Sequence, residues 1–152
     1  RYESMTLNQL EKDLKQAMRD RDTLRLSVIR MLRSALHNEK IAKQSELTED
    51  QVTNVLSRQA QQRRDSIAAF EKGNRPDLVQ KEKSELAFIV EYLPEPMLRD
   101  EIIKLVEGII LEEQAQSLRD MGKVMARVMP VVRGRADGRE VSSIVTGLLS
   151  DK

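Results

Sequence analysis

The chain has 152 residues, of which 34% are charged and 39% apolar, and its formal net charge is +1. This length suits one ordinary domain or two small ones, and no apolar run approaches the ~18 residues that cross a bilayer, so we expect no membrane segment. The absence of cysteine excludes disulfides and thiolate metal sites, and the single histidine, His37, disfavours a histidine-based metal or triad site.

The regular pattern begins at Met5, which we expect to be the natural start of the protein. Residues 1–4 would then be either an artificial addition or the end of a longer leader. No positively charged segment followed by an apolar one is present, so secretion is not supported. We therefore expect a cytoplasmic protein, or an organellar one if a leader has been removed.

Apolar residues recur every three and four positions in the first part of the chain, which indicates amphipathic helices. Thr6 with Gln9, and Thr48 with Gln51, have the spacing of a capping box. Gly73 is a suitable helix C-cap, and Pro76 is tolerated in a first helical turn. The predicted helices span about 6–20, 22–42, 49–72 and 75–93.

Pro94 and Pro96 break this pattern, because two prolines in three residues cannot continue a helix. Three shorter helices are predicted after them, at about 99–113, 118–130 and 138–150, with Ser117 and Asp137 before the last two as caps. Strand-like alternation is absent. The prediction is an all-α chain of two lobes: a four-helix N-terminal domain at 5–93 and a three-helix C-terminal domain at 97–152.

Positive charge is concentrated in segment 119–139, which contains six lysines and arginines and only two carboxylates, a net charge of +4. The six are Arg119, Lys123, Arg127, Arg133, Arg135 and Arg139. Glycines in the 133–138 turn allow a partner to approach the backbone, and the N–H groups that open the last helix suit an anion. The alternative is a loop that serves solubility, with Asp137 acting only as a helix cap.

A second group of cations lies on the predicted helix 22–42, where Arg30, Arg33, His37 and Lys40 share one narrow arc. This arc is either a solvated helix face or a contact stripe for phosphates. Phosphate contacts would weaken steeply with salt. Because aromatic residues make up only 3% of the chain, we expect recognition of a structured RNA by shape and backbone, without sequence-specific reading of DNA.

Two charged residues interrupt apolar helix faces: Arg63 on the third predicted helix and Glu82 on the fourth. An Arg63–Glu82 ion pair between the helices would explain both. We expect this pair to be structural, because removing one partner would leave a costly buried charge.

The residues that catalysis would require are missing. No nucleotide-binding glycine loop, serine nucleophile elbow, metalloprotease motif or paired-carboxylate signature occurs. Met121, Met125 and Met129 follow helical spacing and are expected to fill the core. The prediction is that the chain has no catalytic residues, no metal site and no cofactor, and is not an enzyme by itself.

Several segments of the chain resemble the YqeY family. They are the stretch from Met5-Thr6-Leu7 to Ser34-Ala35-Leu36, then Gln62-Arg63-Arg64-Asp65, Gly73-Asn74-Arg75-Pro76-Asp77-Leu78 and Tyr92-Leu93-Pro94. The most specific segment runs from Asp120-Met121-Gly122-Lys123 through Gly134-Arg135-Ala136-Asp137-Gly138. It is similar to the tail of GatB, a component of the glutamine-dependent Asp/Glu-tRNA amidotransferase.

This resemblance implies a stand-alone version of the C-terminal helical and tail domains of GatB, which hold the body of the tRNA. The chemistry of that enzyme belongs to a cradle domain that has no counterpart here, although the family label would be carbon–nitrogen ligase with glutamine as amido-N-donor. By resemblance, Lys123, Arg135 and Arg139 are the best candidates for tRNA contact. The expected role is an accessory RNA-binding protein; the alternative is a helical adaptor that docks on an amidotransferase or synthetase.

Overall fold

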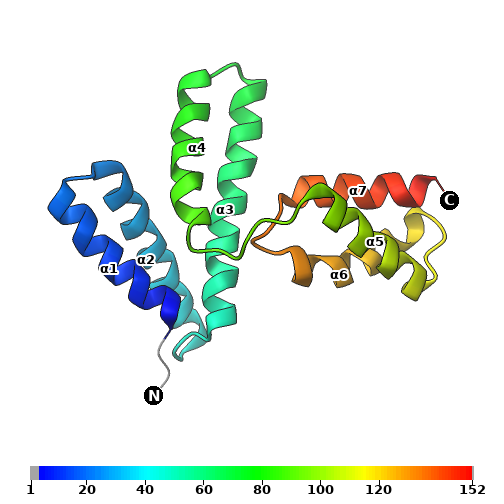
Figure 1. Ribbon diagram of the computed structural model, residues 1–152, viewed down its shortest axis with the longest axis horizontal. Coiled ribbons are helices and arrows are strands. Elements are labelled where there is room, and N and C mark those ends of the chain that lie inside the picture. Colours follow the sequence, from blue (N-terminus) through cyan, green and yellow to red (C-terminus); the bar gives the residue numbers. More distant parts are fainter. Residues whose placement is uncertain (1–3, 152) are drawn as a thin grey trace. The chain divides into compact units, whose positions relative to one another are not determined.

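The computed structural model describes residues 4–151. Within that range it contains helices and no strand, so the chain is all-α, as the hydrophobic periodicity predicts (Figure 1). The helices are α1 (Met5–Asp20), α2 (Thr23–Lys43), α3 (Glu49–Lys72), α4 (Pro76–Val90), α5 (Arg99–Glu113), a 3-10 helix η1 (Leu118–Asp120), α6 (Met121–Val132) and α7 (Gly138–Ser150). None of the helices in residues 4–151 has both the length and the apolar character needed to cross a membrane.

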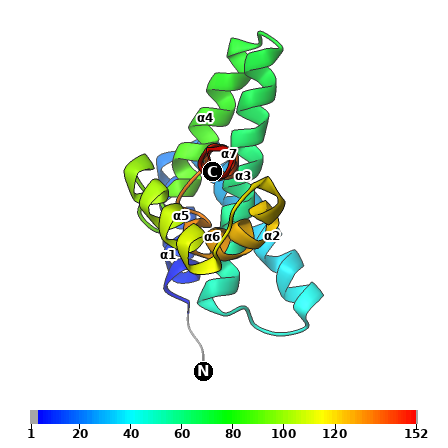
Figure 2. The same ribbon diagram turned by 90° about the vertical axis from the view of Figure 1, so that its right-hand side faces the viewer.

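The chain divides into two compact units, and the boundary falls between Leu93 and Pro94. In the N-terminal unit, α3 and α4 form a long antiparallel hairpin (Figure 2), and α1 and α2 form a second antiparallel pair (Figure 1). Leu10, Ile29, Leu32, Leu56 and Ile89 are at most 1% exposed and belong to one core. Burial of this apolar surface is the main force that holds the four helices together.

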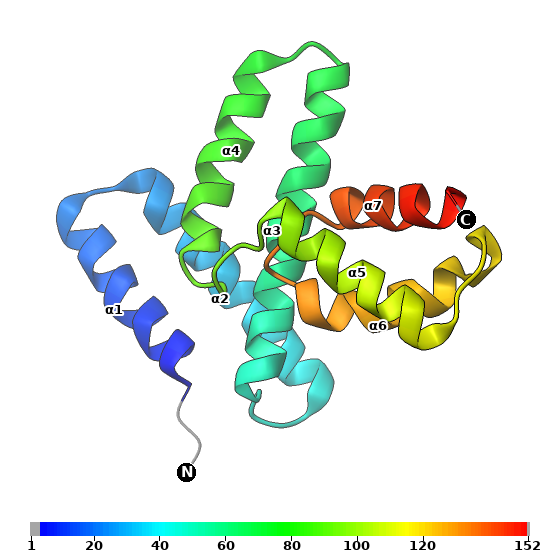
Figure 3. The same cartoon turned by 45° about the vertical axis from the view of Figure 1, so that its right-hand side comes forward.

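The C-terminal unit consists of α5, η1, α6 and α7, packed around a separate core (Figure 3). That core is built from branched side chains on all three α-helices, among them Ile102, Val128 and Val145. The three methionines of α6 pack against it, which confirms their expected role as core residues.

Side-chain caps mark most of the helix starts. The Thr48–Gln51 capping box is present in both directions, and Asp137 caps α7. The prediction for the first helix was wrong, because its N-cap is Ser4 and not Thr6. The Ser4 hydroxyl accepts a hydrogen bond from the Leu7 N–H at 3.1 Å.

Ser4 and Thr6 both donate their hydroxyl protons to the Glu49 carboxylate, at the start of α3. Ser4 is only 3% exposed. The beginning of α1 is therefore joined to the beginning of α3 by polar contacts, and the residue before Met5 takes part in the fold.

Three helix boundaries in the second half of the chain differ from prediction: the end of α4 and both ends of α6. Helix α4 ends at Val90 instead of Leu93. Residues 118–120 form a 3-10 turn, in which the Asp120 N–H donates to the Ser117 carbonyl at 3.0 Å, and Asp120 Oδ2 also accepts a hydrogen bond from the Gln116 N–H at 2.8 Å. Helix α6 then continues through the exposed Pro130 to Val132, since Val132 is fully buried in the C-terminal core.

Several helices end on a residue with a left-handed backbone. Arg21, Gln44, Asn74 and Gln114 have φ angles of 53–55° although none is glycine. Gly73 is the C-cap of α3, as predicted, but its φ is −82° and the left-handed conformation falls on Asn74 instead. Asparagine tolerates this conformation better than most residues do.

Candidate functional site

Three predicted RNA-binding cations, Arg119, Lys123 and Arg127, lie one helical turn apart along η1 and α6, and all three are exposed. We call them the α6 stripe. Helix α6 itself contains no carboxylate. The Arg119 side chain has no ion pair or hydrogen bond within residues 4–151, and Lys123 Nζ lies 3.4 Å from the Glu113 carbonyl oxygen. The stripe is thus a line of accessible positive charge.

Arg127 is the most engaged member of the α6 stripe. Its guanidinium lies 2.7 Å from Glu112 Oε2 and 3.1 Å from Glu113 Oε1, both at the end of α5. Hydrogen bonds to Glu112 and Glu113 raise the pKa of Arg127 above its ordinary value. Exposed ion pairs of this kind contribute little to stability, so an incoming phosphate can replace the carboxylates at small cost.

Arg135 occupies a different environment in the turn between α6 and α7. Its Nε donates to the Glu95 carbonyl at 2.8 Å, and its own carbonyl accepts from the Met97 N–H at 2.8 Å. The residue is partly buried, beside the buried Gly134 with φ of 77°. These bonds fasten the first residues of the C-terminal unit to this turn, which gives Arg135 a structural part within the unit.

The carboxylate of Asp137 occupies the N-terminus of α7. Asp137 Oδ1 accepts from the Arg139 N–H at 2.9 Å, and Asp137 Oδ2 lies 3.3 Å from the Arg139 guanidinium. The anion that the helix start attracts is therefore the side chain of Asp137. Arg133, at the C-terminal end of α6, is exposed.

The second predicted group of cations lines a groove of about 720 Å³ between α1 and α2. We call it the α1–α2 groove. Four leucines form its apolar part: Leu7, Leu10, Leu36 and Leu47. Its charged and titratable residues are Arg30, Arg33, His37, Lys40, Glu11 and Glu46.

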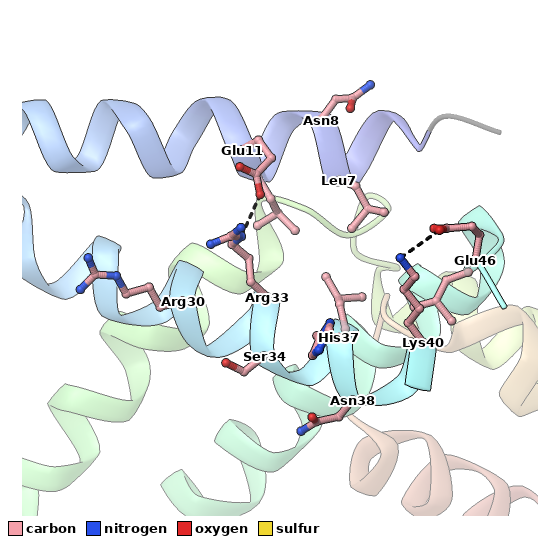
Figure 4. Close-up of a pocket in the computed structure, with 13 residues that line it drawn as sticks. Leu7, Asn8, Glu11, Arg30, Arg33, Ser34, His37, Asn38, Lys40 and Glu46 are labelled. Carbon is pink, nitrogen blue, oxygen red and sulfur yellow. Dashed lines mark ion pairs between the residues drawn. The ribbon is translucent and has the colours of Figure 1, made fainter. Parts of the chain in front are cut away.

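Two ion pairs cross the edges of this groove (Figure 4). Arg33 Nε lies 2.8 Å from Glu11 Oε1 on α1, and Lys40 Nζ lies 2.9 Å from Glu46 Oε1 in the loop after α2. Arg30 and His37 are exposed and have no ion pair or side-chain hydrogen bond within the described part of the chain. These two side chains are thus available to a ligand.

Arg63 lies beside Glu82, the residue that the sequence pairs with it, at 3.8 Å from Nε to Oε2. Glu85 is closer, at 3.4 Å, and Arg63 also approaches Gln59 and Met31. The three charged side chains are only 12–17% exposed. The sequence prediction did not include Glu85, although it lies three positions after Glu82 and hence on the same helix face.

The sequence did not predict a second polar cluster, which joins α1, α2 and the residues that follow α4. The Tyr92 hydroxyl donates to Asp13 Oδ2, and Arg25 Nη2 lies 3.7 Å from Asp13 and 3.6 Å from Glu91. Arg25 also lies over the face of the Phe88 ring, with its Cζ 5.8 Å from the ring centroid. Burial, and then the hydrogen bond to Asp13, raise the pKa of Tyr92 well above its usual range. Tyr92 and Asp13 are 79 positions apart, so no local pattern could indicate their contact.

Metal-ligating residues do not gather in the described part of the chain. Within residues 4–151 no group of three or more histidine, cysteine, aspartate or glutamate side chains could hold a metal ion.

Several fungal relatives share the name Altered inheritance of mitochondria protein 41, mitochondrial. The Lachancea thermotolerans protein is 40% identical over 110 residues, which cover 71% of this chain and 59% of that protein, less than two thirds of its length. The Pyrenophora tritici-repentis protein is 31% identical over 153 residues, covering 99% of this chain and 84% of the relative. A Saccharomyces cerevisiae protein is 35% identical, with 80% and 71% covered.

A family model described as Yqey-like protein matches residues 7–149. That range begins in the first turn of α1, contains α2 to α6 in full, and ends one residue before the last residue of α7. Together with the relatives, it shows that the chain belongs to the YqeY family.

Proposed function

We propose that the protein binds structured RNA, such as tRNA, through the exposed cations of its C-terminal unit. The observation that carries the proposal is the α6 stripe, with Arg119 in η1 and then Lys123 and Arg127 at one-turn intervals on α6, which contains no carboxylate of its own. A row of cations at this spacing neutralises successive phosphates without reading bases. Exposed Arg133 and Arg139 extend the positive charge beyond the end of the stripe.

The kind of RNA follows from what the chain offers besides charge. Its two phenylalanines and two tyrosines supply few platforms on which bases could stack. Recognition of an RNA by shape and phosphate positions is therefore favoured. The resemblance to the tail of GatB supports tRNA as this RNA, in an accessory role toward glutamine-dependent amidation and without the amidating chemistry itself.

The place of action that we propose is the mitochondrion or another organelle. The fungal relatives are named as mitochondrial proteins. This favours the organellar alternative over the cytoplasm, and localisation of the fluorescently tagged full-length protein would test it.

Electrophoretic mobility shift with unfractionated tRNA tests RNA binding. We expect a shift at low salt that weakens steeply as salt is raised. The triple variant Arg119→Gln, Lys123→Gln and Arg127→Gln should reduce the slope of log K against log salt by about 2–3. Lys104→Gln, an exposed cation on α5 outside the stripe, is the matched control and should leave the shift unchanged. No shift at low salt, or an equal effect of the control, contradicts the proposal.

A protein-binding role is the second candidate, and the α1–α2 groove favours it. Its partly exposed Leu7 is an apolar contact that phosphates do not use, and Glu11 and Glu46 would repel a chain charged at every phosphate. In this role the protein would act as an adaptor, for example on an amidotransferase or a synthetase. Capture of a partner by the tagged protein, persisting after nuclease treatment, is the expected result; release of every captured protein by nuclease would contradict it.

A further inference from the structure

The α1–α2 groove has the length of a short helical segment. Its α2 side extends from Arg30 to Lys40, ten residues along the helix, which corresponds to roughly 15 Å at 1.5 Å per residue. A volume of about 720 Å³ lies above the four leucines. Leu10, Leu36 and Leu47 are almost fully buried, and Leu7 is partly exposed. The groove is therefore shallow, with apolar residues along its base.

Charge along the groove is unevenly balanced. Glu11 and Glu46 each pair with one cation, Arg33 and Lys40 respectively. Arg30 and His37 have no such partner within residues 4–151. Among the residues that line the groove, three lysines and arginines stand against two glutamates, and Arg30 is the one of the three without an ion pair within residues 4–151. The uncompensated positive charge calls for a ligand that is acidic at the edge.

A peptide satisfies this combination better than a nucleic acid does. The residues that line the groove include no aromatic side chain of the Phe, Tyr or Trp type on which a base could stack. A phosphate chain carries a charge on every nucleotide and would meet the carboxylates of Glu11 and Glu46, whereas a peptide can carry its few carboxylates beside Arg30 and His37 only. An amphipathic helix would place an apolar side chain on the exposed part of Leu7 and its acidic side chains against Arg30 and His37, away from Glu11 and Glu46.

We propose that the α1–α2 groove docks an acidic amphipathic helix of a partner protein. This inference rests on the protein-binding role described above and names its site and the chemistry of its ligand. The apolar face of the ligand would cover Leu7, and its carboxylates would lie along Arg30 and His37. Ile41, one turn beyond His37 on α2, is 61% exposed and extends the apolar surface past the groove.

A synthetic helical peptide of about 12 residues, with leucines on one face and glutamates on the other, is the probe. Its binding to the full chain is measured by fluorescence anisotropy, and the site is mapped by amide chemical shifts. We expect shifts to concentrate on residues of α1 and α2 that line the groove. A peptide of the same composition in scrambled order, which has no apolar face, should bind at least about tenfold more weakly.

The double variant Arg30→Glu and His37→Glu should weaken peptide binding by about tenfold or more. Both residues are exposed and make no ion pair within residues 4–151, so their replacement leaves the core intact. Lys15→Glu, an exposed cation on α1 outside the groove, is the control and should bind as the unchanged chain does. Glutamine replacement of the α6 stripe should also leave peptide binding unchanged, which separates this inference from RNA binding.

Three results would overturn the inference: equal binding of the scrambled peptide, no binding of the helical peptide, or displacement of the peptide by tRNA that depends on Arg30. The last would assign the groove to RNA. If nuclease-resistant partner capture persists in the Arg30→Glu and His37→Glu variant, the groove assignment fails while the adaptor role remains.

Discussion

The arginines of the two units differ in how far water reaches them, and this difference decides what each can do. In the N-terminal unit the Arg63 side chain is 12% exposed and lies between two carboxylates. In the C-terminal unit the Arg127 side chain also faces two carboxylates but is 45% exposed. Where water is largely excluded, an arginine and its partners become part of the packing. Where water is present, the same pairing is weak and the charge stays available to a ligand.

The largest expected effect comes from a contrast between leucines. Leu56→Ala removes a fully buried side chain from the N-terminal core and should lower the free energy of unfolding by about 3 kcal/mol. Leu111→Ala in α5 changes a side chain that is 79% exposed and should have no measurable effect. Urea denaturation measures both, and similar losses in the two variants would contradict the burial described for them.

Arg63→Met sharpens the comparison of the arginines themselves. It leaves Glu82 and Glu85 close together without their cation and should cost about 2 kcal/mol in the free energy of unfolding. Adding Glu82→Gln and Glu85→Gln should recover most of this loss, because no uncompensated charge then remains. Arg127→Met is the exposed counterpart and should leave the urea midpoint unchanged; a loss as large as that of Arg63→Met would erase the distinction between the units.

Tyr92→Phe tests the second buried cluster. Removing the hydroxyl that donates to Asp13 should lower the free energy of unfolding by about 1.5 kcal/mol at neutral pH. Urea denaturation measures this loss. An unchanged stability would show that the hydrogen bond contributes nothing.

The same variant gives a pH dependence with a definite sign. Burial and the bond to Asp13 raise the pKa of Tyr92 above its ordinary value of 10.0, so the folded chain holds the phenol proton more strongly than the unfolded chain. This contribution is fully present below pH 10 and is lost as the pH rises above it, since the unfolded chain ionises first. Unfolding measured across this range should show a smaller loss above pH 10 in Tyr92→Phe than in the unchanged chain.

The smallest effects are expected at the start of α7. Asp137→Ala removes the side chain that accepts from the Arg139 N–H and should cost about 1 kcal/mol. Arg139→Gln breaks only an exposed pair and should leave thermal unfolding unchanged. Equal effects would mean that the ion pair, and not the helix cap, stabilises this end.

Local sequence signals predicted most of the fold because they act within a few residues. The Thr48–Gln51 box and the Asp137 cap involve neighbours, and hydrophobic spacing identified the α-helices found in residues 4–151. The sequence pattern begins at Met5 and therefore places the first cap at Thr6, whereas Ser4 caps α1 and is buried against Glu49, 45 positions away. Such a contact leaves no trace in spacing along the chain.

The candidate sites were less predictable, because a list of cations does not reveal what each one touches. Arg135 and Arg119 are equivalent in a count of charge, yet one bonds to the backbone of Glu95 and the other is free of such bonds within residues 4–151. Likewise, the stripe of Arg30, Arg33 and Lys40 was visible in the sequence. The leucines beside it belong partly to α1 and to the loop after α2, so the groove needed three-dimensional structure to be seen.

The stability of the fold could be raised at three helix ends, where a residue other than glycine has a left-handed backbone. Arg21, Gln44 and Gln114 each accept a backbone conformation that a side chain disfavours, and glycine would adopt it without that penalty. The left-handed conformation costs a residue with a side chain roughly 1–2 kcal/mol, part of which glycine would regain after its larger loss of chain entropy on folding. The sites are spread over both units. An engineer seeking a more heat-resistant version could therefore begin at these three turns and leave every core residue and both candidate binding surfaces untouched.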